Sequence, residues 1–200
     1  MAAADMQNAN MQNDDPLNAE ISIEGGKLII RYSVRNGGKV PVYLTNKVYN
    51  SDSKPVLGPN NVYGRIGDDN VLELGKEMPR MPEGASPVNL VAPYMTQLNP
   101  GAQFDEEIVL DLPLTPFAEY RDNRPVLDDE NNIVLLTAKA VDFTLGYYIP
   151  PEGAEAKSGV AFDVPVDSFI NPKGGRATYG VMRSKRFSLR VPVVQTAAMR

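Results

Sequence analysis

The chain has 200 residues, of which 42% are hydrophobic and 22% charged, and its formal net charge is −5. It contains no cysteine and no histidine, which excludes thiolate and imidazole zinc sites, cysteine nucleophiles and every catalytic arrangement that needs a histidine base. A chain of this length buries a large apolar core without disulfides or a metal, and its 17 prolines and 16 glycines favour a fold rich in turns.

Residues 1–18 are polar and contain a short tandem echo, MQNAN followed by MQNDD. Because this segment holds too little apolar surface to fold alone, it predicts a flexible tail, with residues 19–200 forming a single domain. The alternative is an arm that orders on a partner or on a neighbouring subunit. The tail lacks the basic start and apolar run of a secretory signal. No stretch approaches the roughly 18 apolar residues of a membrane span, so we expect a cytoplasmic protein.

The first strand signals lie between residues 21 and 45. Residues 27–35 alternate polar and apolar side chains, the period of a half-buried strand. Asn36-Gly37-Gly38 follows and tolerates the positive φ angles of a tight turn, after which residues 39–45 resume the alternation. The pattern predicts a hairpin with Asn36–Gly38 as its turn. Pro41 has no N–H to donate, so the returning strand is expected at a sheet edge or at a bulge.

Further strands follow along the chain, with turn signals at residues 67–70, 99–101 and 128–132. Residues 160–166 and 186–194 read as a late pair of strands. No apolar stripe of helical period persists for the length of a helix. About nine or ten short strands with regularly spaced turns predict an all-β, antiparallel β-sandwich.

Two stretches carry a resemblance to a known group of folds. LIIRYSVRNGGKVPVYLT (residues 28–45) resembles a strand pair of bacterial immunoglobulin-like sandwiches, and LNPGAQFDEEIVLDLPL (residues 98–114) resembles a proline-glycine turn and strand that recur in them. The resemblance implies an immunoglobulin-like β-sandwich. Because the chain is about twice the length of a minimal domain of this kind, the fold is expected to carry long loop insertions. The resemblance transfers no function.

Three acidic clusters are candidate sites. Asp128-Asp129-Glu130 is the best candidate for Ca²⁺, which takes six to eight oxygen ligands, whereas Asp68-Asp69 and residues 105–107 fit less well. None matches the spacing of an EF-hand loop, and aspartate is an ordinary residue of turns. A carboxylate pair for glycoside hydrolysis is also available, but the clusters lie in turns and the chain has no tryptophan to stack on a sugar. We predict no cofactor.

The segment KEMPRMPEGASP (residues 76–87) contains Met78, Arg80 and Met81. Methionine and arginine are enriched at protein interfaces, and loops carry much of the binding in β-sandwiches. These three residues therefore mark a candidate contact loop.

Charge is distributed unevenly along the chain. Residues 171–200 contain seven basic residues and no acidic residue, so their formal charge is +7. Residues 1–170 contain the other 13 basic residues and all 25 acidic residues, so their formal charge is −12. Seven basic residues supply the positive charge: Lys173, Arg176, Arg183, Lys185, Arg186, Arg190 and Arg200. Three interpretations remain open. Acidic strands neutralise the segment inside the fold, it contacts the acidic face of another subunit, or it contacts nucleic-acid phosphates. The isoelectric point near 4.9 argues against nucleic acid.

Together these observations predict a non-catalytic, protein-binding or assembly subunit that forms a homo-oligomer. The basic segment and the Met78–Met81 loop are its expected contact surfaces. One alternative is a carbohydrate or small-ligand binding module that uses Tyr147 and Tyr148. Another is a proteinase inhibitor that acts through an exposed loop.

Overall fold

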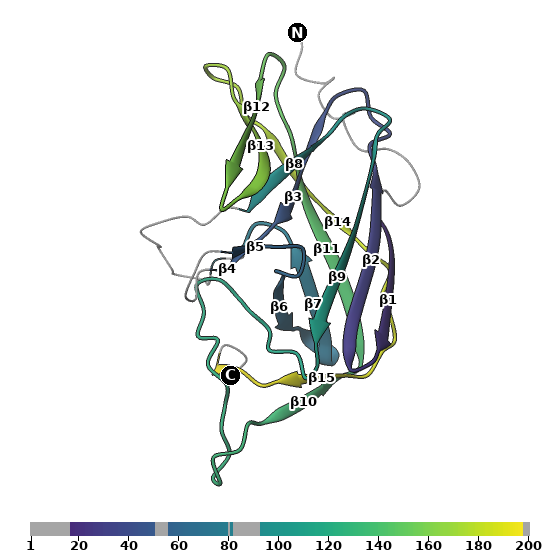
Figure 1. Cartoon of the computed structure of the whole chain (residues 1–200), viewed down its shortest axis with the longest axis vertical. Coiled ribbons are helices and arrows are strands. Elements are labelled where there is room, and N and C mark those ends of the chain that lie inside the picture. The colour runs from purple at the N-terminus through teal and green to yellow at the C-terminus, as the bar shows by residue number, and fades with distance from the viewer. Residues whose placement is uncertain (1–16, 51–55, 80, 82–92, 198–200) are drawn as a thin grey trace.

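The computed structural model describes residues 17–50, 56–79, 81 and 93–197. Regular structure in these residues is almost entirely β-strand (Figure 1), and the described residues contain no α-helix. A short 3₁₀ turn lies at Asp68–Asn70. The all-β prediction is therefore confirmed for this part of the chain. No helix that could span a membrane occurs in it.

A three-stranded antiparallel sheet forms one layer, and its order is β1-β2-β9. Its strands are β1 (Leu17–Glu24), β2 (Lys27–Arg35) and β9 (Gln103–Asp111). The predicted alternation over residues 27–35 is confirmed as β2. β1 begins two residues before the expected domain boundary at residue 19, because the side chain of Leu17 is 3% exposed and belongs to the core.

A larger sheet faces this layer and has the order β12-β13-β8-β3-β11-β7-β6, with β14 on the other side of β11. Its strands are β3 (Val42–Lys47), β6 (Tyr63–Ile66), β7 (Val71–Lys76), β8 (Tyr94–Leu98), β11 (Ala140–Ile149), β12 (Glu155–Ala161), β13 (Val164–Ile170) and β14 (Thr178–Arg183). Two short pairs complete the structure, β4 (Tyr49–Asn50) with β5 (Val56–Leu57) and β10 (Leu135–Ala138) with β15 (Val191–Val194).

β11 is the central strand, and its neighbour changes along its length. Residues 140–145 pair in parallel with β7, whereas Tyr147 and Tyr148 pair antiparallel with β3. The expectation of a purely antiparallel fold is therefore wrong, and the large sheet is mixed. The segment that joins β7 to β11 contains β8, β9 and β10, which gives the chain the length it needs to return in the same direction.

The turn at Asn36–Gly38 is not a hairpin, which corrects the prediction. β2 pairs with β1 and β9, whereas β3 pairs with β8 and β11, so the chain changes sheets at this turn. Asn36 is fully buried, and its side-chain Nδ2 donates to the carbonyls of Val40 and Leu98, at 2.9 Å each. β3 is an interior strand that begins after Pro41, so the predicted edge position is wrong. The predicted bulge is not at Pro41 either, because the register of β3 shifts between Leu44 and Lys47.

A second corner lies beside the first. The turn predicted at residues 99–101 joins β8 to β9, which again belong to different sheets. Backbone hydrogen bonds join the two corners, from Asn36 N to the Ala102 carbonyl at 3.0 Å and from Gly101 N to the Asn36 carbonyl at 2.7 Å. The two layers are thus tied together at one end of the fold.

One hydrophobic cluster fills the space between the layers. Alternate side chains of β2 enter it from the small sheet, and Leu72, Leu74 and Phe143 enter it from the large sheet. The side chains of Leu28 and Ile30 are completely buried. The core therefore uses the period-two pattern visible in the sequence.

Candidate interaction surfaces

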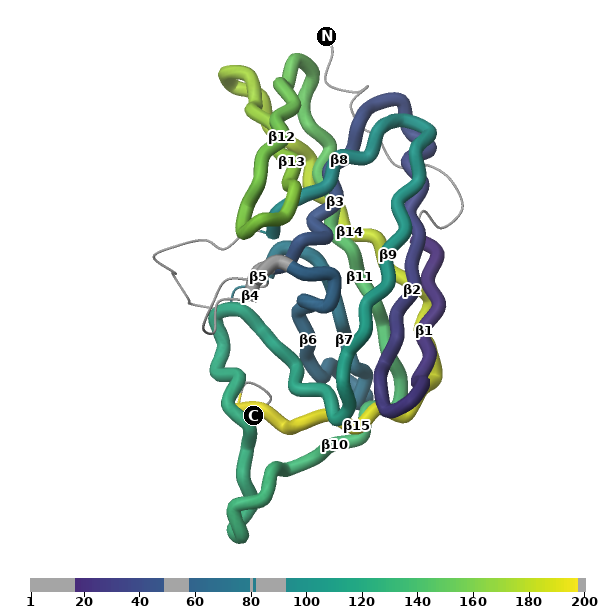
Figure 2. Tube along the Cα trace, in the orientation of Figure 1, coloured from purple at the N-terminus to yellow at the C-terminus, as the bar shows by residue number. Residues whose placement is uncertain are grey.

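The β12–β13 hairpin lies at one end of the molecule (Figures 1 and 2) and forms the outermost edge of the large sheet. The two strands pair over seven residues, from Glu155↔Ile170 to Ala161↔Val164. Six of the seven residues of β12 are exposed. Within the described part of the chain, β12 pairs with β13 alone.

Three contacts fix the inner strand of this hairpin to the body. The Phe169 ring lies 4.7 Å from that of Tyr43, centroid to centroid. The Asp167 carboxylate accepts a hydrogen bond from Gln97 N at 2.8 Å, and the Lys47 ammonium donates to the Pro165 carbonyl. β13 is therefore anchored, which holds β12 in a defined position with its outer side in solvent.

The hairpin turns at Phe162-Asp163, two residues with φ angles of 50° and 63°. Residues other than glycine, asparagine and aspartate rarely adopt this left-handed backbone conformation. Phe162 is 45% exposed, and its ring meets that of Tyr94 edge-on at 6.3 Å. The exposed aromatic tip and the 72% exposed Val160 give the hairpin an apolar character that solvent alone does not favour.

The free edge of β12 offers a regular set of backbone groups. Ala161 and Val164 flank the two-residue turn and form the first hydrogen-bonded pair, and hydrogen-bonded pairs then alternate with non-hydrogen-bonded ones along an antiparallel ladder. The N–H and C=O groups of Ala156, Ser158 and Val160 therefore point away from β13. Pro165, which has no N–H, lies opposite Val160 in agreement with this alternation.

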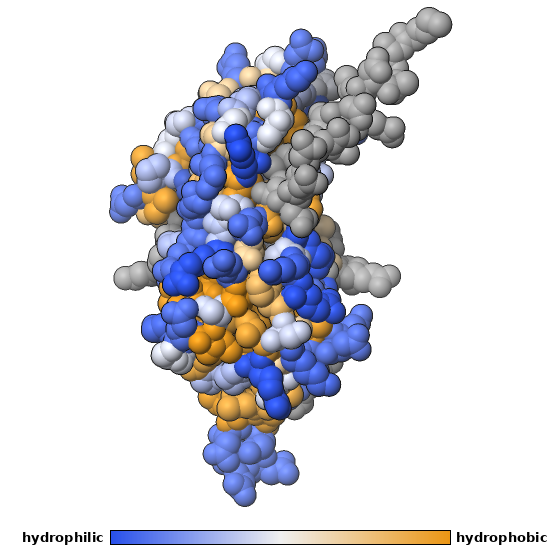
Figure 3. Space-filling model, turned by 90° about the vertical axis from the view of Figure 1, so that its right-hand side faces the viewer, coloured by the Kyte–Doolittle hydropathy of each residue, from blue (hydrophilic) through white to orange (hydrophobic). Residues whose placement is uncertain are grey.

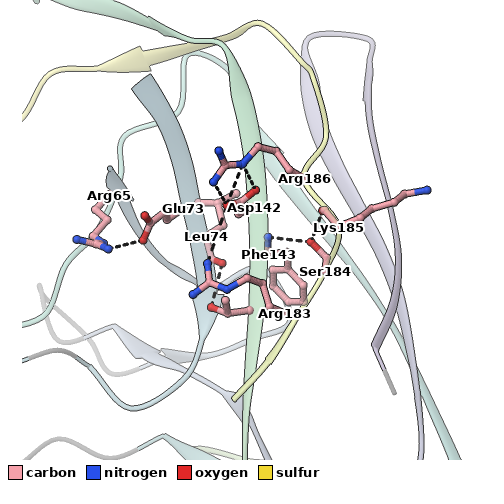
Figure 4. Close-up of polar contacts among 10 residues, drawn as sticks. Arg65, Glu73, Leu74, Asp142, Phe143, Arg183, Ser184, Lys185 and Arg186 are labelled. Carbon is pink, nitrogen blue, oxygen red and sulfur yellow. Dashed lines mark hydrogen bonds and ion pairs between the residues drawn. The ribbon is translucent and has the colours of Figure 1, made fainter. Parts of the chain in front are cut away.

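The basic segment is partly neutralised within the fold (Figure 4). Asp142 of β11 has a side chain only 5% exposed, and the Arg186 guanidinium binds both its oxygens, with Nε–Oδ1 at 3.0 Å and Nη2–Oδ2 at 2.8 Å. Arg183 forms a second, longer ion pair with the same carboxylate at 3.9 Å. This bond to Asp142 raises the pKa of Arg186, so both predicted contact residues serve the fold.

The other basic residues of the segment lie on the surface. Lys185 points away from Asp142 (Figure 4) and its ammonium lies 5.2 Å from the centroid of the Phe187 ring. Lys173, Arg176 and Arg190 are exposed and form no ion pair with any described residue. Arg200 lies outside the described residues.

The predicted contact loop is described only in part. Met78 is partly buried, and its backbone N–H donates to the Tyr179 hydroxyl at 2.9 Å. Met81 is 50% exposed, and Arg80 lies outside the described residues. The tyrosines of the predicted ligand-binding alternative are both partly buried. Tyr147 packs against the core, and the Tyr148 ring lies 6.3 Å from that of Phe169, centroid to centroid.

Figure 3 shows a hydrophilic projection at the lower end of the molecule. The candidate calcium residues lie in an exposed turn before β10. The Asp128 carboxylate accepts hydrogen bonds from the backbone N–H of Glu130 and Asn132, at 2.9 and 2.8 Å. The bond from Asn132 holds the pKa of Asp128 below its ordinary value. Asp128, Asp129 and Glu130 are exposed, and nowhere in the described residues do three acidic side chains gather as metal ligands. The Asp128 carboxylate therefore stabilises its own turn.

A buried ion pair joins the two layers. The Lys76 side chain is completely buried and its ammonium contacts the Glu106 carboxylate, which also accepts a hydrogen bond from the Tyr32 hydroxyl at 2.6 Å. Burial lowers the pKa of Lys76, and burial together with the Glu106 charge raises that of Tyr32. Removal of one partner from such a pair leaves an uncompensated charge in the core.

Sequence reasoning missed both the hairpin and the ion pair. The dipeptide Phe162-Asp163 is not a turn signal, so the sequence predicts one strand over residues 160–166 where the structure has the turn of a hairpin. The ion pair did leave a signal, because Lys76 continues the inward alternation of Leu72 and Leu74, and Glu106 does so between Phe104 and Ile108. A charged residue at an inward position indicates a buried partner.

No family model matches the chain, and neither the curated proteins nor the solved structures contain a match to it.

Proposed function

We propose that the chain is a non-catalytic assembly subunit, and that two copies associate by pairing their β12 strands into one continuous sheet. The single observation that carries this proposal is the free edge of β12, which is seven residues long, almost fully exposed and apolar at Val160. In most proteins a short edge strand, charged side chains or a covering element keeps such an edge from pairing with another chain. A second copy covers it in the proposed assembly.

The sequence of β12 suits antiparallel pairing with itself about a two-fold axis at Ser158. In this register Ser158 lies opposite its own copy, and Ala156 lies opposite Val160 of the second copy. All three residues direct their backbone groups outward, so each of these pairs exchanges hydrogen bonds. Lys157 lies opposite Gly159, so no two like charges are directly opposed. The ladder therefore uses the whole strand.

This assignment moves the proposed contact away from the basic segment. Arg183 and Arg186 bind the buried Asp142 of their own chain, so withdrawing them for another subunit would expose an unpaired carboxylate. Lys173 and Arg176 are exposed and supply at most the polar rim of a contact, where charges contribute little. Backbone hydrogen bonds and apolar burial carry the proposed association.

The architecture proposed for this role is an immunoglobulin-like sandwich with insertions. Two features support it: a shared core between two sheets, and two adjacent corners at which the chain crosses from one sheet to the other. The parallel pairing of β7 with β11 departs from the ordinary antiparallel pattern of such domains. The β12–β13 hairpin is an extension of the large sheet.

Light scattering behind a sizing column tests the proposal. We expect a mass of twice the 21.9 kDa chain at low salt and again at about 1 M salt, where the Debye length falls to about 3 Å. Ser158→Pro removes an outward N–H and the hydrogen bond from the Ser158 hydroxyl to the Asp167 carboxylate, but it removes no backbone hydrogen bond to β13. It is expected to yield a folded monomer. The matched control, Lys173→Gln with Arg176→Gln, should keep the dimer.

A multimer that dissociates in high salt, or in the control variant alone, would assign the contact to the basic segment instead. A wild-type monomer at concentrations of about 0.1 mM would contradict the proposed association, since specific dimers bind more tightly than this.

A further inference from the structure

The buried contact between Lys76 and Glu106 holds an amine and a carboxyl group together between the two sheets. Lys76 ends β7 of the large sheet, and Glu106 lies within β9 of the small sheet. The Lys76 side chain is completely buried, and that of Glu106 is 15% exposed. An amine and a carboxyl group are the two reactants of amide formation, so this contact holds the reactants of a covalent bond between the sheets.

The neighbouring strands fix the position of both groups. Lys76 pairs with Leu145 of β11, and its carbonyl accepts a hydrogen bond from the Thr45 hydroxyl at 2.8 Å. Glu106 lies directly opposite Tyr32 in the β2–β9 ladder, and the Tyr32 hydroxyl donates to the Glu106 carboxylate at 2.6 Å. Reactants that are held in contact in this way react much faster than the same groups free in solution.

The surroundings of the pair favour an uncharged product. The Tyr32 ring packs against the Phe143 and Phe104 rings, at 5.0 and 6.2 Å between centroids. Burial lowers the pKa of Lys76, which makes the neutral, nucleophilic amine easier to form. Two charges held in an apolar core carry a desolvation cost, whereas an amide is neutral. Condensation of the pair therefore removes both charges from the core.

We propose that Lys76 and Glu106 condense after folding into an amide that joins the two sheets covalently. The Lys76 ammonium transfers a proton to the Glu106 carboxylate, and the nitrogen lone pair then attacks the carboxyl carbon. The C–N bond forms, the bond from carbon to Oε2 breaks, and this oxygen leaves as water with two of the three ammonium protons. The third proton stays on the amide nitrogen. The step balances without an oxidant, a reductant or a further reactant.

The Tyr32 hydroxyl contacts the oxygen that leaves. It donates to Oε2 of Glu106, the same atom that the Lys76 ammonium contacts. Tyr32 is therefore placed to protonate this oxygen as the C–O bond breaks and to recover a proton from the nitrogen. Glu106 and Tyr32 also line a hollow at the surface of the small sheet, which gives the released water a path to solvent. The bond lies within one chain and is independent of the β12 edge.

Peptide mapping by mass spectrometry tests the proposal. Trypsin does not cleave after an amidated lysine, so the condensed chain should yield residues 66–80 joined to residues 81–121, with the summed mass reduced by one water. The unreacted chain yields residues 66–76 and 81–121 as separate peptides. We expect the joined product from the wild-type chain purified in its folded state. Separate peptides alone would overturn the proposal.

Three variants assign the reaction to its groups, with circular dichroism to confirm that each is folded. Lys76→Arg keeps a positive charge beside Glu106 but removes the nucleophilic amine, so the joined peptide should disappear. Tyr32→Phe should reduce the joined fraction at least about tenfold at equal times after synthesis. Lys47→Arg is the matched control, because Lys47 lies in the field of Glu106 but donates to the Pro165 carbonyl, and it should react like the wild type. A joined peptide in Lys76→Arg would overturn the proposed bond, and an undiminished fraction in Tyr32→Phe would overturn the role of Tyr32.

Discussion

Two hairpins of this protein have nearly the same geometry and opposite environments. β1–β2 pairs over eight residues and turns at Gly25-Gly26, with φ angles of 57° and 77°. β12–β13 pairs over seven residues and turns at Phe162-Asp163, also with positive φ. The first buries one face in the core, whereas most of the second lies in solvent. The difference shows which hairpin builds the fold and which is available to a partner.

The two hairpins also differ in the charged side chains that they carry. The outer face of the small sheet carries ion pairs between its strands, Lys27 with Asp111 at 2.8 Å and Arg31 with Glu107 at 2.7 Å, and Glu20 and Glu24 lie along β1. Charged side chains of this kind discourage pairing with another chain. β12 carries the same number of charged residues, but its Glu155 and Lys157 have opposite signs, so pairing two copies of β12 does not meet the repulsion that the like charges of β1 would cause.

The largest expected effect comes from the ion pair that joins the two layers. Lys76→Met should lower the free energy of unfolding by about 3–5 kcal/mol, because Glu106 then remains charged in the core. Urea denaturation followed by circular dichroism measures this change. Lys157→Met, at an exposed position of β12, should change stability by less than about 0.5 kcal/mol. Equal effects of the two variants would contradict the buried role of Lys76.

A matched pair of isoleucines compares the two hairpins directly. Ile30 of β2 is completely buried, whereas Ile170 of β13 is 48% exposed. Ile30→Ala should lower the free energy of unfolding by about 2–5 kcal/mol through the cavity that it leaves. Ile170→Ala should cost less than about 1 kcal/mol in the same denaturation experiment. A larger loss for Ile170→Ala would place the second hairpin in the core.

Losing a glycine should destabilise the turn of the first hairpin, whereas gaining a glycine should stabilise the turn of the second. Gly26→Ala puts a Cβ on a residue with a φ of 77°, and although no atom lies close enough to clash, the strained backbone should cost about 1 kcal/mol. Phe162→Gly removes the same strain and should slow amide hydrogen exchange in β12 and β13 by about fivefold, the equivalent of about 1 kcal/mol. Faster exchange in Phe162→Gly would show that the Phe162 side chain stabilises the turn.

The sequence predicted the core strands well, because burial on one face leaves a period-two pattern. Residues 27–35 showed it, and they form β2. The turns at residues 67–70 and 128–132 were also predicted, since their Asp, Asn and Gly residues act locally. The sequence could not show that Asn36–Gly38 is a corner between sheets, because a corner and a hairpin use the same residues and differ only in which strands pair.

The candidate sites were harder to predict for a similar reason. The excess of basic residues from residue 171 onward is visible in the sequence. The sequence does not show that the buried Asp142 binds Arg183 and Arg186, because only the pairing of distant segments brings these residues together. The contact between residues 116–123 and β6 likewise leaves no periodic pattern in the sequence. The free edge of β12 is a property of topology, since it exists because no other described strand pairs there.

Disulfide trapping tests the central claim most directly, because the wild-type chain contains no cysteine. In the proposed dimer, Ser158 faces its own copy in a hydrogen-bonded pair, where the Cα atoms are about 5.5 Å apart, a distance that a disulfide spans. Ser158→Cys should therefore form a covalent dimer on mild oxidation, and Ser168→Cys, an exposed position on the neighbouring strand β13, should remain monomeric. Equal cross-linking of the two variants, or none in Ser158→Cys, would contradict the pairing of β12.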